Sequence, residues 1–572
     1  MSTIRLINFI AIIYFTYIAI KMKYQRMYVL IDCILFIIFI FLIIYHNIIK
    51  DKLSFSKQMI NINNDYLARI DGNWINFNDI GEEFIDKKHK YSFDLDIVGN
   101  KSLFQLINIT NTWNGRTMLA KTLLEAQYDK GEINLRQQAI KELSTKLDFC
   151  QNLQLVSGKH KEELQNTDKL IKYAKSKETS IKSERIKDLI YFLPMIVIPI
   201  SITIIIFKIK KMYILIGVMI FIQYIIWIIG FHKNSKILGS VRSFKNTLEI
   251  YVNILKLLEK EKFETKKIND IKTILFNEGH SSILAIKELD KISEKINLRY
   301  NTSLNIILNG LLLWDYECVF LLEKWKSKYG LQVETWVETM GEIEALISLS
   351  VLIQINENIS FPTINDSKLR VRAESLGHPL INSNEIVPND ISLDDSIFII
   401  TGSNMSGKTT FLRTLGINLV LAYSGAPVYA TKMECPILDI FTSMRITDDL
   451  RNGVSTFYAE LLRIKEIINH GKNNNMIFLI DEIFRGTNSV DRILGAKNVL
   501  ANLNELGAIG AITTHDLELC VLDKYHRIKN YNFSEQYKDN KIYFDYKIKE
   551  GKSTSTNARY LMNLVGIKIL ND

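Results

Sequence analysis

Proline is scarce in this sequence, with seven residues among 572, and only Pro194 and Pro199 precede Pro362. Long uninterrupted helices are therefore permitted through the first part of the chain. The cysteines lie far apart and form no C-x-x-C pair, so neither a zinc site nor a disulfide framework is indicated, and a reducing compartment is favoured. The five cysteines are Cys33, Cys150, Cys318, Cys435 and Cys520.

A strong charge of one sign is also missing. The 71 Lys and Arg residues against 62 Asp and Glu residues give a net charge of +9. This excess is compatible with anionic lipid or nucleic acid as a partner but is diagnostic of neither. Hydrophobic residues make up 47% of the chain and gather in a few long blocks, which excludes a fully soluble chain.

Four apolar runs approach or reach the roughly 20 residues that a helix needs to cross a bilayer. Runs 189–207 and 212–231 carry no formal charge, whereas Arg5 and Asp32 lie near an end of the other two, where they can reach the interface. The alternatives are a cleaved signal peptide for the first run and a buried core hairpin for the second pair. The runs are 4–20, 27–45, 189–207 and 212–231.

The middle of the chain is predicted to be helical. Apolar residues recur at three- and four-residue steps over 241–258, which predicts a packed or coiled helix. The charged stretch 259–272 is most simply its solvated continuation, with a DNA-contacting face as the alternative. The apolar run 304–322 resembles a fifth span, but four polar residues interrupt it and predict a core helix instead. They are Asn305, Asn309, Asp315 and Glu317.

From about Leu369 the pattern changes to strands, turns and Gly-containing loops, which predicts an α/β domain. The apolar run 397–400 leads through Thr401 into a G-x-x-x-x-G-K-[ST] motif that opens a helix, the context that a phosphate-binding loop requires. Its backbone would wrap the phosphates of ATP, Lys408 would reach the terminal phosphates, and the Thr409 hydroxyl would bind Mg²⁺. The loop and the start of the helix comprise Gly402, Ser403, Asn404, Met405, Ser406, Gly407, Lys408, Thr409 and Thr410.

Two further apolar runs end in polar residues suited to nucleotide hydrolysis. Run 476–480 is followed by Asp481, which suits the Mg²⁺ shell, and by Glu482, which suits the base that polarises the attacking water. The apolar run that begins at Ile509 leads through two threonines to His515, in the place expected for a γ-phosphate sensor. Glu482, His515 and Lys408 are therefore the candidate catalytic residues.

These segments resemble the MutS family of the ABC ATPase superfamily. The resemblance runs through TGSNMSGKTTFLRT at 401–414, LAYSGAPVYA at 421–430, DDLRNGVSTFYAEL at 448–461, LIDEIFRGTNSVD at 479–491 and TTHDLEL at 513–519. It implies that Ser455 and Thr456 reach the ATP of a second subunit across a homodimer, and that Ile386 and Val387 contact the adenine. Asn404 would be the asparagine of the phosphate loop, and 551–567 a tail that supports the dimer.

The helical part resembles the family's core more loosely, at 94–126, 341–353 and 375–381. The family's mismatch-reading domain has no counterpart between Tyr45 and Asp94, and its DNA-gripping clamp is not recognisable. The expected fold is thus an α-helical, membrane-anchored core and lever region followed by a C-terminal α/β P-loop ATPase domain of ABC type.

This organisation divides the chain into six segments. Both apolar pairs predict helical hairpins, so the remainder lies on one side of the membrane, which is the cytoplasm if the chain uses ATP. Basic residues flanking 189–231 outnumber those of its turn, as a cytoplasmic location of the flanks requires. The segments are a transmembrane hairpin at 1–50, a linker at 51–91, the first part of the core at 92–187, a second hairpin at 188–232, returning lever and core helices at 233–360, and the ATPase domain at 361–572.

Two functions remain open. The first is a membrane-anchored, MutS-like ATPase that closes as a homodimer around ATP and Mg²⁺ and binds DNA, with mismatch recognition itself in doubt. The second is an ATP-driven transport or membrane-remodelling assembly that does not act on DNA. The segment between Lys408 and Asp481 lacks an LSGGQ-type signature, which argues against transport.

Overall fold

The computed structural model describes residues 2–24, 26–158, 166–176, 179–181, 183–242, 245–277, 281–365, 369–445, 456–472, 475–484, 488–538 and 541–553. The chain forms two compact units, Met1–Leu67 and Ala68–Asp572, and each is described by itself.

The first unit is a helical hairpin of α1 (Ser2–Lys21) and the greater part of α2 (Arg26–Ile70). The rings of Phe9 and Phe39 lie 5.8 Å apart, and the Thr16 hydroxyl donates a hydrogen bond of 3.0 Å to Asp32, so this carboxylate has a partner inside the hairpin. Helix α2 continues to Ile70, well into the segment expected to be a linker, because neither glycine nor proline interrupts it before Gly72. Gly72 has a φ of 79° and caps the short helix that follows.

Four helices in the described part of the chain are long and apolar enough to cross a membrane, or five if α13 and α14 together form one bent span. The second pair is α8 (Glu184–Ile206) and α9 (Tyr213–Arg242). All four expected runs therefore coincide with helices that leave most of their apolar side chains exposed.

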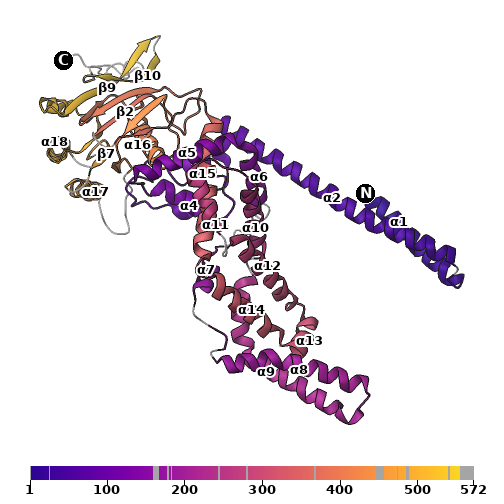
Figure 1. Ribbon diagram of the computed structural model, residues 1–572. Coiled ribbons are helices and arrows are strands. Elements are labelled where there is room, and N and C mark those ends of the chain that lie inside the picture. Colours follow the sequence, from indigo (N-terminus) through magenta and orange to yellow (C-terminus); the bar gives the residue numbers. More distant parts are fainter. Residues whose placement is uncertain are drawn as a thin grey trace. The chain divides into compact units, whose positions relative to one another are not determined.

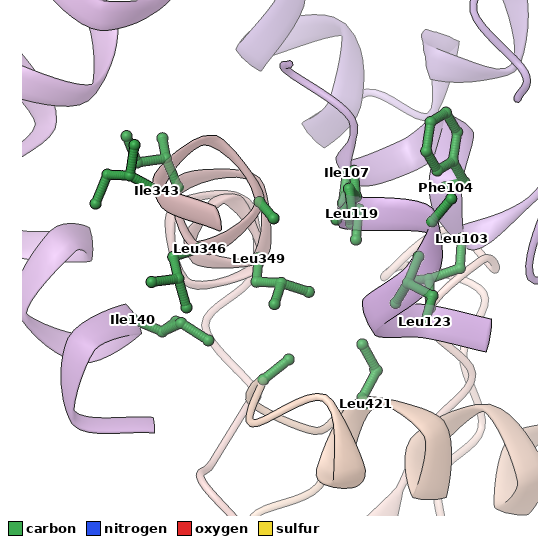
Figure 2. Close-up of a cluster of buried hydrophobic side chains, with 14 of the residues drawn as sticks. Leu103, Phe104, Ile107, Leu119, Leu123, Ile140, Ile343, Leu346, Leu349 and Leu421 are labelled. Carbon is green, nitrogen blue, oxygen red and sulfur yellow. The ribbon is translucent and has the colours of Figure 1, made fainter. Parts of the chain in front are cut away.

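Helix α15 (Val333–Ile355) is the centre of the helical part of the second unit and packs on α4 and α5. Figure 2 shows Ile343, Leu346 and Leu349 of α15 among apolar side chains of α3 (Leu103–Ile107), α4 and α5, with Leu421 of the C-terminal region reaching the same cluster. Gly341 permits the close approach of α4, because a Cβ there would lie 2.7 Å from the Asn114 carbonyl oxygen.

The other helices of this part surround α15 or extend from it (Figure 1). They are η1 (Asn73–Asn76), η2 (Glu82–Phe84), α3 (Leu103–Ile107), α4 (Trp113–Leu124), α5 (Lys130–Thr145), α6 (Leu147–Ser157), α7 (Asp168–Lys175), η4 (Lys210–Met212), α10 (Lys245–Lys260), α11 (Lys266–Phe276), α12 (Ser282–Leu298), α13 (Thr302–Leu312) and α14 (Trp314–Tyr329).

Two expectations for the middle of the chain need correction. Stretch 259–272 does not continue the preceding helix, because α10 ends at Lys260 and α11 starts at Lys266 after Thr265 in extended conformation. Run 304–322 is not one core helix, because Leu313 adopts a left-handed conformation and bends the chain by 78° between α13 and α14. Only α14 buries most of its apolar residues. The helical periodicity is confirmed over the described residues 245–258, with Leu248, Tyr251 and Ile254 buried.

The C-terminal region is the expected α/β domain, built on a six-stranded sheet of order β10-β9-β4-β8-β7-β6. All neighbouring strands are parallel except β10 and β9. The strands are β4 (Ile397–Thr401), β6 (Asp439–Ser443), β7 (Met476–Asp481), β8 (Ile509–Thr514), β9 (Ile528–Lys538) and β10 (Lys541–Glu550). Helices α16 (Lys408–Tyr423), α17 (Thr456–Gly471), α18 (Ser489–Glu505) and η5 (Leu517–Lys524) connect these strands.

A smaller sheet of order β1-β5-β2-β3 accompanies the large one. It comprises β1 (Thr363–Ile364), β2 (Arg370–Leu376), β3 (Asn389–Asp394) and β5 (Lys432–Cys435). In the large sheet, the central strands β4, β7 and β8 are buried along their whole length, as expected for parallel strands covered on both faces. Their carboxyl ends meet at one edge, with Thr401 opposite Thr514 and Asp481 opposite Thr513.

Candidate nucleotide site

The predicted phosphate loop joins the end of β4 to the start of α16. Gly407 has a φ of 106°, which favours glycine, and directly precedes the first residue of α16. A Cβ on Gly402 would lie 2.7 Å from the Phe533 carbonyl oxygen, so this position also requires glycine. The loop thus presents its backbone at a helix N-terminus, where amide hydrogens and the helix dipole favour an anion.

The side chains of the loop fit a phosphate ligand. Lys408 is buried, and its ammonium donates hydrogen bonds of 2.8 Å to the carbonyl oxygens of Gly402 and Ser403, which holds it across the loop. The Ser406 hydroxyl is buried without a hydrogen-bond partner among the described residues, which leaves it available to a ligand oxygen. Ser403 is held by a hydrogen bond of 2.9 Å to Glu535 on β9.

Thr409 and Asp481 form a pair of oxygen ligands beside the loop. The Thr409 hydroxyl lies 3.0 Å from both carboxylate oxygens of Asp481, and Thr513 on the neighbouring strand donates a hydrogen bond of 2.5 Å to the same carboxylate. No cluster of three or more His, Cys, Asp or Glu side chains able to hold a metal occurs in the described residues. Mg²⁺ does not require one, because it retains waters and takes phosphate oxygens alongside one or two protein oxygens.

Glu482 and His515, predicted from separate strands, lie in direct contact. His515 Nε2 lies 2.8 Å from Glu482 Oε1 and 2.9 Å from Asn404 Oδ1, so the imidazole connects the carboxylate to the phosphate loop. Glu482 has a φ of 51°, and its amide donates to the Thr513 carbonyl oxygen at 3.1 Å. An unfavourable backbone conformation held by hydrogen bonds is typical of residues that must be aimed at a ligand.

A cavity of about 500 Å³ adjoins the loop and suits a nucleobase. Its walls include Ile386 and Val387, the expected adenine contacts, together with Phe533 and Tyr546 from β9 and β10. Burial, with a smaller contribution from Arg413, lowers the pKa of the His378 imidazole to about 4, so this ring lines the cavity in its neutral form at pH 7. Apolar walls with a few polar groups are typical of small-molecule sites.

Two of the predicted site residues lie wholly or partly outside the described part of the chain. Ser455 lies outside the described residues, as do 448–454 of the signature segment and 554–567 of the expected dimer-supporting tail. Thr456 is the first residue of α17, but its side chain also lies outside what the structure describes. Every other predicted site residue lies in the loop, at the start of α16, at the ends of β7 and β8, or on the cavity wall.

Residues that support the site were not predicted. One of them is Thr513, which donates to Asp481. The other is Glu460 on α17, which is buried. Its carboxylate accepts a hydrogen bond of 2.5 Å from the amide of Phe484, two residues after Glu482. Glu460 therefore ties the start of α17, close to the signature segment, to the loop after β7. Thr513 and Glu460 both lie inside segments that carry the family resemblance. Their polar side chains within these segments were the signal that could have identified them.

A pair of aspartates in the helical part, Asp94 and Asp96, binds the α/β domain. Asp94 accepts hydrogen bonds from Thr442 Oγ1 at 2.7 Å and from the amides of Met444 and Arg445 at 3.0 and 2.9 Å. Asp96 lies 2.6 Å from Arg445 and 3.1 Å from Arg413 of α16. Asp96 thus connects the phosphate-loop helix to the strand end that leads into the signature segment.

We expect Asp96→Asn to lower ATPase turnover while leaving nucleotide affinity nearly unchanged, because the substitution weakens this connection without touching the cavity. A coupling of about 1 kcal/mol corresponds to a roughly fivefold decrease in turnover. Steady-state phosphate release and nucleotide binding would separate the two effects. The control is Asp395→Asn, which removes a more exposed ion pair with Arg527 within the α/β domain; equal decreases in both variants would contradict the expectation.

Comparisons with known proteins find relatives of the part of the chain that contains this site. Residues 398–567 match the family MutS domain V. The DNA mismatch repair protein MutS of Bacillus subtilis (strain 168) is 33% identical over 270 residues, which cover 45% of this chain and 31% of the relative. The protein of the same name from Streptococcus pyogenes serotype M18 is 32% identical over 293 residues, covering 48% and 34%. The chain therefore spans about a third of the length of these relatives.

Proposed function

The chain belongs to the MutS family through its C-terminal region, and from this premise we propose that it is a membrane-anchored, magnesium-dependent ATPase that acts on DNA. The observation that carries the proposal is the convergence of Lys408, Thr409, Asp481, Glu482 and His515 around one phosphate cradle, although β4, β7 and β8 supply them from distant parts of the sequence.

In this proposal the loop amides and Lys408 would bind the phosphates of ATP, and Thr409 and Asp481 would hold Mg²⁺, which would supply neutralisation of charge on the phosphate oxygens. Glu482 orients and polarises the attacking water at the carboxyl end of β7. His515 keeps the Glu482 carboxylate pointed toward the loop through its contacts of 2.8 and 2.9 Å. Ile386, Val387, Phe533 and Tyr546 contact the base.

The family resemblance extends the proposal to a homodimer. Ser455 and Thr456 of one subunit would complete the nucleotide site of the other, so ATP binding would close the two ATPase domains on each other. Glu460 supports this arrangement, because its contact with Phe484 joins the beginning of α17 to the segment after the catalytic carboxylate. Movement of the signature segment would then change the position of Glu482.

The four long apolar helices support membrane anchoring, with the ATPase domain facing the cytoplasm. Helices α1, α2, α8 and α9 expose apolar side chains along most of their length, and a bilayer would cover them. Both hairpins would return the chain to the side on which ATP is present.

The test is the ATPase activity of the detergent-solubilised full chain with and without homoduplex, mismatched and branched DNA. We expect DNA to change the turnover rate, and DNA affinity to fall at least roughly tenfold between about 50 and 200 mM salt, because the contacts would be mainly to phosphates. Unchanged turnover with every DNA would favour the transport or membrane-remodelling alternative. A salt-independent preference for mismatched duplex would contradict phosphate-based binding.

A further inference from the structure

Helix α13 exposes apolar side chains that the following helix, α14, mostly buries. Leu304, Ile307 and Leu311 are 40%, 53% and 41% exposed. They recur at three- and four-residue steps and therefore share one face of the helix. In α14, which follows directly after the bend at Leu313, the larger apolar side chains are mostly buried. An apolar stripe on a helix of the lever region requires a partner.

Helix α13 lies against the middle of the second apolar hairpin. The Tyr224 hydroxyl of α9 donates a hydrogen bond of 2.9 Å to the Ile306 carbonyl oxygen. A Cβ on Gly310 would lie 2.5 Å from the same hydroxyl, so the two helices approach closely there. Tyr224 precedes Phe231, the last residue of the expected span, by seven residues. At 1.5 Å per residue, this contact lies about 10 Å inside the apolar segment.

Two of the four polar residues that predicted a core helix lie away from this exposed face. Asn309 and Asp315 are fully buried. Asp315 accepts hydrogen bonds from Arg299 Nε at 2.9 Å and from Trp227 Nε1 of α9 at 3.0 Å, and its amide donates to Asn309 Oδ1 at 2.9 Å. These polar groups are thus satisfied inside the helix bundle, as the hydrocarbon region of a bilayer demands.

We propose that α13 lies within the bilayer as a third element of the second membrane hairpin, with lipid acyl chains covering Leu304, Ile307 and Leu311. The inference rests on the proposed membrane anchoring and extends it to a helix too short to cross. Continuity with the exposed apolar surface of α8 and α9, which α13 contacts, identifies lipid as the occupant. The junction of Arg299, Asp315 and Trp227 then joins the lever helices to the membrane.

Variants with one added cysteine in proteoliposomes test the proposal, in a background where the exposed Cys33 is replaced by serine and the four remaining cysteines are buried. Ile307→Cys reports on α13, Ile222→Cys on the span of α9, and Ser327→Cys on the exposed surface of α14. Each variant is reacted with a membrane-impermeant maleimide. Each is also labelled in detergent with a fluorophore, reconstituted, and quenched with lipids that carry a nitroxide on the acyl chain.

We expect the cysteines at 307 and 222 to react at least roughly tenfold more slowly than that at 327, and their labels to be quenched by the acyl-chain nitroxide. Rapid reaction at 307 with protection at 222 would overturn the placement of α13 and keep the membrane anchor. Rapid reaction at all three would overturn the second membrane hairpin itself, and with it the placement of α13. Protection at 307 without quenching would mean that protein, such as a second copy of the chain, covers α13, and would also overturn the proposal.

Discussion

Glu482→Gln should bind ATP and Mg²⁺ but hydrolyse the nucleotide roughly 100- to 10,000-fold more slowly than the wild type, the range that a positioned general base contributes. The glutamine side chain retains the size of glutamate and can still accept a hydrogen bond from His515, which lies 2.8 Å from Glu482. It loses the carboxylate that polarises the attacking water. Phosphate release under saturating ATP measures turnover, and equilibrium binding of a fluorescent ATP analogue measures affinity.

Lys408→Ala provides the contrast. The buried ammonium spans the loop to Gly402 and Ser403, so its removal should weaken nucleotide binding itself. If ATP closes a homodimer, Glu482→Gln should accumulate as a dimer with ATP, whereas Lys408→Ala should not, and sedimentation in detergent would distinguish them. Glu518→Gln, an exposed carboxylate on η5 of the same domain, is the matched control and should keep wild-type turnover. Normal ATP hydrolysis by the Glu482→Gln variant would exclude Glu482 as the general base.

The nucleotide site could be predicted because its chemistry is local in sequence. Strand, loop and first helical turn follow one another from Ile397 to Thr410, and the two acids stand at the end of one apolar strand, β7. The carboxyl ends of parallel strands meet at one edge, so Asp481 and His515 could be expected near Lys408 before their contacts were seen. Local motifs together with sheet topology were sufficient there.

The long-range contacts could not be predicted. Asp94 and Asp96 bind residues more than 300 positions away, and no pattern around them indicates which partners they have. The bend at Leu313 could not be predicted from the sequence either, because leucine seldom adopts the left-handed conformation that the tertiary packing imposes. Asn309 and Asp315 were correctly seen as unfavourable toward lipid, but their burial depends on Arg299 and Trp227, which lie elsewhere in the sequence.

The helical core contains a carboxyl group whose ionisation should control stability. Glu344 of α15 is fully buried against the start of α4, and this desolvation raises its pKa to about 7, despite hydrogen bonds from Thr112 and from the Asn111 amide at 3.0 Å. Gly115 leaves no room for water on the other side, because a Cβ there would lie 2.4 Å from Glu344 Oε2.

The sign of the pH dependence follows from the two pKa values. Below the ordinary value of 4.5, Glu344 is protonated in both the folded and the unfolded chain. As the pH rises from 4.5 to 7, the unfolded chain ionises first, so the free energy of unfolding decreases. Above pH 7 Glu344 is ionised in both the folded and the unfolded chain. The full decrease in the free energy of unfolding is then about 3 kcal/mol for a pKa shift of this size.

Glu344→Gln should therefore remove most of the loss of stability between pH 5 and 8 and make the variant more stable than the wild type at pH 8. The amide can replace both contacts, because its oxygen accepts from the Asn111 amide and its nitrogen donates to the Thr112 hydroxyl. Chemical unfolding of the full chain in detergent, followed by tryptophan fluorescence at several pH values, measures the difference. Glu338→Gln, an exposed carboxylate on the same helix, should retain the wild-type pH dependence. If Glu344→Gln also retains it, the pH-dependent loss of stability arises from other groups and Glu344 is not its source.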